Sequence, residues 1–157
     1  MPSFKRAPLL DLSPEDFIMA YEINTKSAFL CAKSVVLAMK SHGKGSIINI
    51  GSISGRGTKK ERADMAVYGC AKAAVMNLTL HMAHQWGRKY ASTASPRALI
   101  DTPRPQGINR PELASEAVKP IALGRAGKPD EAASVALLAS DAASFVSGAV
   151  IDVNGGE

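Results

Sequence analysis

The chain contains 157 residues, of which 46% are hydrophobic and 21% are charged, and it carries a formal net charge of +5. This size and composition predict a single globular domain and exclude a disordered or low-complexity chain. The longest apolar stretch, residues 17–39, is interrupted by charged side chains, so no membrane span is expected. Only 5% of the residues are aromatic and no basic stripe follows a helix, which argues against nucleic-acid binding.

The sequence contains two cysteines, Cys31 and Cys70, and three histidines. So few cysteines argue against a disulfide framework and fit a reducing compartment. No apolar leader is visible in the first residues, so we expect a cytoplasmic protein. His81 and His84 are three positions apart on one predicted helix, but no cysteine or carboxylate cluster joins them, and no metal site is expected.

The first predicted element is a helix over residues 13–41. Ser13 is a suitable N-cap, Pro14 occupies the first helical position, and Asp16 stands three positions after the cap. This is the pattern of a helix N-terminus. Gly43 predicts where the helix ends, because glycine readily adopts the left-handed conformation that closes a helix.

Helices and strands are then expected to alternate along the chain. A β-branched run bounded by glycines predicts a short buried strand at residues 46–50. Apolar side chains at helical spacing predict a long second helix over residues 63–90. Further along we expect a strand at 91–95, a small helix near 111–118, a helix over 129–140 and a last strand at 149–153. This alternation predicts an α/β fold with a parallel sheet, as one domain over residues 1–157.

Ser52, Tyr68 and Lys72 form a candidate catalytic group. Ser52 directly follows the predicted strand, and open α/β sheets place ligand chemistry at the carboxyl ends of their strands. Tyr68 and Lys72 are four positions apart, so they share one face of the second helix. A free phenol titrates near pH ~10, and a cation about 4 Å away favours its ionised form enough for acid–base work near neutral pH. Alone, such a pair is also compatible with an ordinary solvated helix surface.

The sequence around these residues resembles the short-chain dehydrogenase/reductase family. Ile-Asn-Ile-Gly-Ser52 resembles the family's strand and catalytic serine, and Tyr68-Gly-Cys-Ala-Lys72 resembles its catalytic tyrosine and lysine. Asn24, within Tyr-Glu-Ile-Asn-Thr-Lys-Ser, resembles the asparagine that completes the catalytic tetrad. A plain outward-facing polar residue is the alternative interpretation of Asn24.

Later segments extend the resemblance. Pro96, followed by Ile-Asp-Thr102, is similar to the loop that contacts the nicotinamide, and Gly-Arg-Ala-Gly-Lys-Pro-Asp-Glu131 with Val-Asn-Gly-Gly156 resembles the C-terminal signature. Residues 91–97 depart from the pattern, because Arg97 stands where the family has a glycine. We interpret this departure as a local reading-frame or splicing disturbance.

The resemblance implies an oxidoreductase that transfers a hydride between NAD or NADP and a small secondary alcohol or ketone. Tyr68 would exchange a proton with the substrate oxygen, and Lys72 would make Tyr68 a better proton donor. Ser52 would hydrogen-bond the substrate oxygen. Asn24 would distort the first helix and position a water. The residues implied in cofactor binding are Tyr68, Lys72, Pro96 and Thr102.

The resemblance covers only the second half of the family's usual chain. Nothing before Asn24 resembles the strand, glycine-rich turn and helix that hold a dinucleotide pyrophosphate. The loop 51–57 has several glycines after a strand, but Ala71 stands about where a phosphate-binding unit needs an acidic residue. We therefore expect a partial Rossmann-like parallel sheet without its N-terminal cofactor unit. A truncated, inactive remnant or an oligomerisation module is the alternative function.

Two surfaces of the chain suggest contacts with other molecules. The residues Arg56, Lys59, Lys60 and Arg62 lie in one loop, which is either a solvated basic loop or part of a site for an anionic cofactor or substrate. In a partial sheet, the strand 46–50 would expose an unpaired edge. We therefore expect the isolated chain to associate. The family resemblance implies that a homo-oligomer would form through the helices 13–41 and 63–90.

Overall fold

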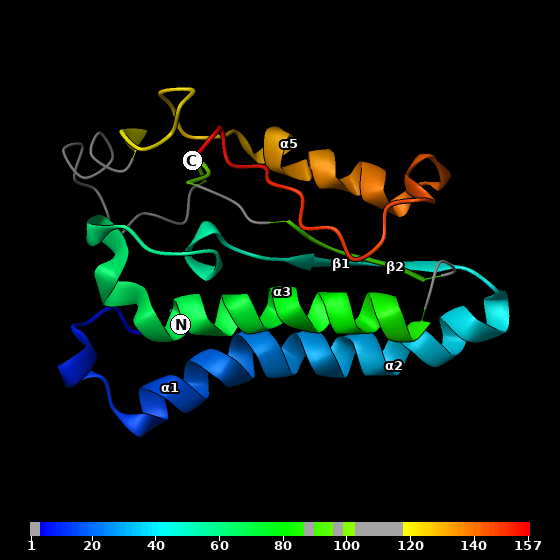
Figure 1. Cartoon of the computed structure of the whole chain (residues 1–157), viewed down its shortest axis with the longest axis horizontal. Helices are drawn as coiled ribbons and strands as arrows, with labels where there is room; N and C mark the ends of the chain where they lie inside the picture. Colours follow the sequence, from blue (N-terminus) through cyan, green and yellow to red (C-terminus); the bar gives the residue numbers. More distant parts are fainter. Residues whose placement is uncertain (1–3, 87–89, 96–98, 103–117) are drawn as a thin grey trace.

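The computed structural model describes residues 4–86, 90–95, 99–102 and 118–157. A short parallel sheet lies between two helical layers (Figure 1). Helices α2 (Ser27–His42) and α3 (Ala66–Trp86) pack on one side of the sheet. The short helix α5 (Pro129–Ala132) and the 3-10 helix Ala133–Ala139 lie on the other. This layering confirms the predicted α/β class.

The predicted helix 13–41 is present, but it is divided into three parts. Helix α1 (Pro14–Tyr21) begins at the predicted capping box, in which the Ser13 hydroxyl accepts from the Asp16 backbone N–H at 3.2 Å. A π-helical segment, Glu22–Lys26, follows, and α2 then continues to His42. Gly43 ends α2 with a φ of 74°, as predicted.

The sheet contains β1 (Gly45–Ile50) and β2 (Tyr90–Ser95), which confirm the strands expected at 46–50 and 91–95. They pair in parallel, with Gly45 opposite Tyr90 and Ile50 opposite Ser95. Within the described part of the chain, no further strand pairs with β1. Helix α3 connects the two strands and confirms the long helix expected over 63–90, but with corrected ends. It begins at Ala66, after the 3-10 helix Lys60–Met65, and Tyr90 already belongs to β2.

Two expectations for the C-terminal part need correction. Residues 149–153 do not form a strand; only single bridge positions occur, at Val150 and Val153. The Val150 carbonyl also accepts from the Arg56 side chain at 3.2 Å. The helix expected over 129–140 is α-helical only in α5 and continues as the tighter 3-10 helix. The small helix expected near 111–118 lies outside the described residues, except for Val118.

A polar contact joins the sheet to α3 inside the core. Thr79 is 0% exposed, and its hydroxyl donates to the Val75 carbonyl at 2.8 Å. The same oxygen accepts from the side-chain amide of Asn49 on β1, also at 2.8 Å and also buried. Among the described elements, α3 contributes the largest share of buried apolar side chains, with Val67, Ala71, Val75, Met76 and Met82.

The outer faces of α1 and α2 stay largely apolar and exposed. Large side chains there are about half exposed, and Leu37 is 72% exposed. None of the helices in the described ranges is both long and apolar enough to cross a membrane.

Replacing Thr79 with valine should lower the free energy of unfolding by about 1–3 kcal/mol, because the buried Asn49 amide would lose its acceptor while the side-chain volume is kept. Urea unfolding followed by circular dichroism measures this change. Thr58→Val is a matched control at an exposed threonine. An unfolding midpoint for Thr79→Val equal to that of the control would contradict the assignment.

Candidate active site

Ser52 lies immediately beyond the carboxyl end of β1, as predicted. The residue is 8% exposed and has an extended backbone. Its hydroxyl accepts from the Ser54 backbone N–H at 3.2 Å, and its carbonyl accepts from the Gly55 N–H at 2.9 Å. The 3-10 turn Ile53–Gly55 that starts here therefore fixes the Ser52 side chain through local hydrogen bonds.

Two glycines allow this turn to pack directly on the backbone of α3. A Cβ atom added to Gly69 would lie 2.8 Å from the Ser54 carbonyl oxygen. One added to Gly55 would lie 2.7 Å from the Ala73 backbone nitrogen. Contacts this short leave no room for a side chain at either position. The turn after Ser52 is thus pressed against the part of α3 that carries Tyr68 and Lys72.

Tyr68 and Lys72 share one face of α3, as their spacing predicts. The Lys72 ammonium lies 5.8 Å from the centroid of the Tyr68 ring. It also donates a hydrogen bond to the Ile50 carbonyl at 2.8 Å, at the last position of β1. Lys72 therefore spans from the tyrosine to the strand end that precedes Ser52, and the three predicted residues occupy one region of the fold.

An aromatic neighbour of Tyr68 was not predicted. The ring of Phe4 stacks on that of Tyr68, with centroids 4.2 Å apart and planes inclined by 19°. The segment that holds Phe4 is anchored nearby, because the Ala7 N–H donates to the Asp64 carbonyl at 3.0 Å and Arg6 pairs with the Asp64 carboxylate at 2.9 Å. The hydrogen bond from Arg6 also lowers the pKa of Asp64. These partners are far apart in sequence, so no local pattern could indicate them.

Asn24 lies in the π-helical segment and is buried. Its side-chain amide donates to the Ala20 carbonyl at 2.8 Å, which excludes the outward-facing interpretation. The neighbouring Thr25 hydroxyl donates to the Ala71 carbonyl at 3.0 Å, and Ala71 lies between Tyr68 and Lys72 on α3. Thr25 is therefore a second contact of the site that sequence reasoning missed.

The two predicted nicotinamide contacts are only partly described. Pro96 lies outside the described residues. Thr102 is half-buried and follows Ile100, which forms a parallel bridge with Gly127. The structure thus brings Ser52, Tyr68 and Lys72 together, places Asn24 on the helix packed against α3, and leaves the roles of Pro96 and Thr102 as predictions.

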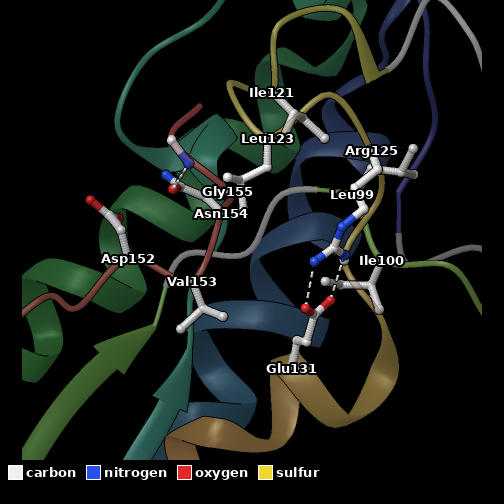
Figure 2. A pocket seen from close by; sticks show the side chains of 12 residues that line it. Leu99, Ile100, Ile121, Leu123, Arg125, Glu131, Asp152, Val153, Asn154 and Gly155 are labelled. Carbon is white, nitrogen blue, oxygen red and sulfur yellow. Dashed lines mark hydrogen bonds and ion pairs between the residues drawn. The ribbon is translucent and has the colours of Figure 1, made fainter.

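A cavity of about 260 Å³ lies elsewhere, between residues 99–100, 121–127 and the chain from Asp152 to Gly156 (Figure 2). None of the predicted site residues lines this cavity. Its charged groups are already paired, because both Nη atoms of Arg125 donate to the Glu131 carboxylate at 2.7 Å. No group of potential metal ligands occurs in the part of the chain that the structure describes. The cavity and the predicted site residues therefore occupy different parts of the described structure.

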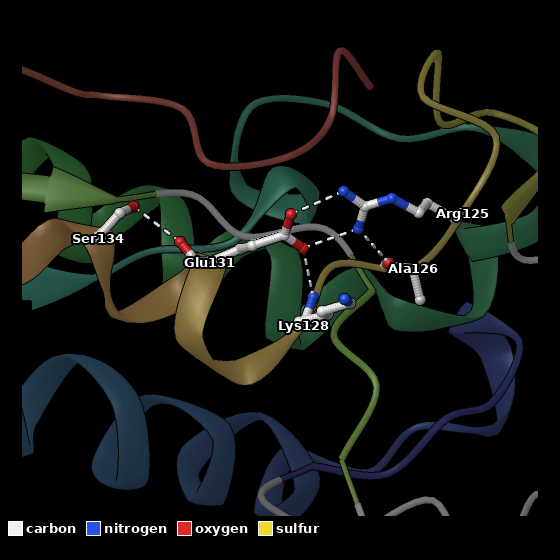
Figure 3. A network of polar contacts seen from close by, with 5 residues as sticks. All are labelled: Arg125, Ala126, Lys128, Glu131 and Ser134. Atoms are coloured by element: carbon white, nitrogen blue, oxygen red, sulfur yellow. Dashed lines mark hydrogen bonds and ion pairs between the residues drawn. The ribbon is translucent and has the colours of Figure 1, made fainter.

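The Arg125–Glu131 pair stabilises the start of α5. The Glu131 carboxylate also accepts from the Lys128 backbone N–H at 2.7 Å, and the Ser134 hydroxyl donates to the Glu131 carbonyl (Figure 3). The hydrogen bonds from Arg125, and next the one from Lys128, lower the pKa of Glu131 to about 2. The network is exposed and closes a helix N-terminus, which is a structural role.

Comparison with known proteins identifies the family. The whole chain, residues 1–157, matches the family model described as enoyl-(acyl carrier protein) reductase. It is 36% identical over 154 residues to the cis-4-hydroxycyclohexanecarboxylate dehydrogenase of Sinomonas cyclohexanicum, which covers 96% of this chain and 60% of that protein. The chain belongs to the short-chain dehydrogenase/reductase family. The resemblance predicted from the sequence is confirmed.

Solved structures of this family share the fold. A gluconate 5-dehydrogenase from Burkholderia cenocepacia, in complex with NADP and tartrate, has a TM-score of 0.89 at 29% identity, covering 98% of this chain and 60% of that chain. A 7α-hydroxysteroid dehydrogenase complexed with NADH and 7-oxo glycochenodeoxycholic acid has a TM-score of 0.87 at 30% identity, covering 97% and 59%. The chain spans about 60% of the length of the curated relatives it matches.

The lowered pKa of Glu131 gives a pH-dependent prediction. A carboxyl group whose pKa falls from 4.5 to about 2 on folding stabilises the protein above pH 4.5, and this contribution is lost as the pH falls toward 2. The difference in Tm between the wild type and Glu131→Gln should therefore be constant near neutral pH and shrink between pH 4.5 and 2. Thermal melts across this range test it, with Arg125→Gln expected to behave alike. A pH-independent difference would rule the pairing out.

Proposed function

We propose that this protein is an NAD(P)-dependent oxidoreductase that acts on a secondary alcohol or ketone through Ser52, Tyr68 and Lys72. The observation that carries the proposal is the position of Lys72, whose ammonium lies over the Tyr68 ring and bonds the carbonyl at the end of β1. Membership of a family of dehydrogenases and reductases supports it, as do relatives described with NADP or NADH.

In this mechanism, each residue acts on the substrate oxygen or on a neighbour. When bound, the nicotinamide supplies or accepts the hydride. Tyr68 donates the proton at its Oη to the carbonyl oxygen in reduction and takes it back in oxidation. Ser52 donates a hydrogen bond to the same oxygen and stabilises the charge that develops there. Lys72, which lies over the Tyr68 ring and bonds the carbonyl at the end of β1, holds this face of α3 at the strand end, and Asn24 shapes the helix that packs behind it.

The described residues fit one end of the cofactor only. Tyr68, Lys72 and Thr102 offer polar groups for the ribose and nicotinamide. The glycine-rich loop after β1 does not fit a pyrophosphate, because Gly55 packs against the α3 backbone at Ala73 and not at a helix N-terminus. Pyrophosphate binding therefore has no candidate among the described residues.

The alternative function, a non-catalytic remnant or oligomerisation module, is not favoured by the relatives, which are dehydrogenases and reductases. Binding of NADH or NADPH, followed by cofactor fluorescence, distinguishes the two functions. Binding to the chain supports the oxidoreductase, and its absence supports the remnant.

Assembly into a homo-oligomer is the second part of the proposal. An apolar groove of about 460 Å³ runs along α1 and α2 and includes Phe17, Tyr21, Phe29 and Leu78. Burial in it raises the pKa of Tyr21. Glu22 and Lys26 line the same groove, so a copy related by two-fold symmetry can place opposite charges against each other. We propose a second copy of this chain as the occupant.

Replacing Tyr68 with phenylalanine should lower kcat by roughly 10²-fold or more, because the proton donor is removed. Oxidation of NADH or NADPH with a panel of ketones measures the rate. Tyr21→Phe is the matched control, since it removes a phenol from another helix. Equal rates for the wild type and Tyr68→Phe would disprove the assigned role.

Replacing Phe29 with aspartate should convert an oligomer into a monomer, because a charge in the apolar contact has no partner. Size-exclusion chromatography with light scattering measures the mass. Leu10→Asp, at an exposed position outside the groove, should leave the mass unchanged. A wild-type chain that runs as a well-folded monomer would refute assembly.

A further inference from the structure

Two arginines of the basic loop are bound by the C-terminal segment of the chain. One Nη atom of Arg56 lies 3.2 Å from the Asp152 carboxylate and donates to the Val150 carbonyl at 3.2 Å. Six positions later, Arg62 forms an ion pair with the Glu157 carboxylate. The loop between Ser52 and α3 is thus held at two points by residues far away in sequence.

The Arg62–Glu157 pair is the more buried of the two. The Arg62 side chain is 19% exposed and that of Glu157 is 2% exposed. A buried carboxylate without its cation is strongly unfavourable, so the pair resists separation. The Nε atom of Arg62 is buried as well, and no hydrogen-bond partner for it occurs among the described residues. Among the described residues, the polar contact of the Arg62 guanidinium is therefore the ion pair with Glu157.

A turn prepares Glu157 for this contact. The Asn154 side-chain amide donates to the Glu157 carbonyl at 2.8 Å, and its oxygen accepts from the Gly156 N–H at 3.1 Å. The Gly155 carbonyl accepts from the Leu123 N–H at 3.1 Å, which fixes the turn to the preceding chain. Hydrogen bonds therefore already fix the backbone that carries Glu157, and forming the ion pair costs little further conformational entropy.

These contacts revise both interpretations of the basic loop. Arg56 and Arg62 are neither freely solvated nor available for an anion, because carboxylates of the same chain bind them. Lys59 and Lys60 remain exposed between them. The two arginines therefore act within the protein.

The same loop leads into the catalytic helix. Arg62 lies in the 3-10 helix Lys60–Met65, which continues directly into α3. The position of this 3-10 helix therefore sets the start of α3 and, with it, the position of Tyr68. Asp64 in this 3-10 helix binds Arg6, in the segment whose Phe4 stacks on Tyr68. A displacement of Arg62 would therefore reach Tyr68 through the helix start and through Phe4.

We propose that Arg62 is a positioning residue that, held by Glu157, sets Tyr68 relative to Ser52, with Arg56 and Asp152 as a second anchor. The Arg62–Glu157 and Arg56–Asp152 pairs together are called the clasp below. The distances and burial of the two ion pairs support the clasp itself, and its effect on catalysis rests on the proposed oxidoreductase function.

Limited trypsin digestion tests the clasp without any activity. Lys59 and Lys60 are the reporter sites, and Glu157→Gln leaves both in place. Loss of the ion pair should speed cleavage at Lys59 and Lys60 by roughly tenfold. This factor is the rise in the population of the opened loop that corresponds to about 1.4 kcal/mol. Glu157→Asp, which keeps the charge, should restore most of the protection. Glu22→Gln, which breaks an exposed pair on another helix, is the matched control and should leave cleavage unchanged.

Asp152→Asn keeps the test decisive if Glu157→Gln does not fold, because its pair with Arg56 is more exposed. It should also speed cleavage at Lys59 and Lys60, by a smaller factor. Cleavage at the rate of the control in the folded variants would overturn the clasp.

Turnover then separates positioning from mere stability. Glu157→Gln should lower kcat several-fold with little change in KM, and Glu157→Asp should recover it. Faster cleavage with unchanged kcat would overturn the positioning role. Failure of the proposed function itself would appear differently, as absent turnover in the wild type with protection of Lys59 and Lys60 intact.

Discussion

The hydrogen bond from the Lys72 ammonium to the Ile50 carbonyl is the contact on which the arrangement of the site depends. It joins the last residue of β1 to the middle of the α3 face, at 2.8 Å. A bond between a cation and a carbonyl is stronger than a neutral one, and it uses an acceptor at the point where the strand ends. Tyr68 lies one turn earlier on the same face, so the bond holds the part of α3 that carries the tyrosine against the end of β1.

Close backbone packing supports this bond from two sides. The turn after Ser52 contacts α3 where Gly69 and Gly55 leave no space for a side chain. From the π-helical segment, the Thr25 hydroxyl donates to the Ala71 carbonyl, in the helical turn between Tyr68 and Lys72. The strand end, α3 and the π-helical segment are therefore joined by direct contacts near Tyr68 and Lys72.

Sequence reasoning succeeded where the controlling interactions are local. The capping box at Ser13, the two parallel strands and the common face of Tyr68 and Lys72 follow from spacing and residue type within a few positions. It failed where a distant side chain decides. The strand expected at 149–153 is reduced to single bridge positions, and the Val150 carbonyl binds the distant Arg56 side chain, which no local pattern indicates. The stack of Phe4 on Tyr68 likewise joins segments that no periodic pattern connects.

The π-helical segment Glu22–Lys26 adds a wider turn inside an otherwise α-helical run. A π turn accommodates one extra residue, and each residue of an α-helix advances the direction of its side chains by about 100°. Deleting a single residue there would turn the segment into ordinary α-helix and leave the side-chain directions of α1 and α2 relative to each other nearly unchanged. The groove-lining Phe17 and Phe29 would then be about 11 α-helical positions apart, roughly 20° in direction, and would still face the same side. A chain without the extra residue is thus expected to keep the groove but to lose the widened turn that holds Asn24.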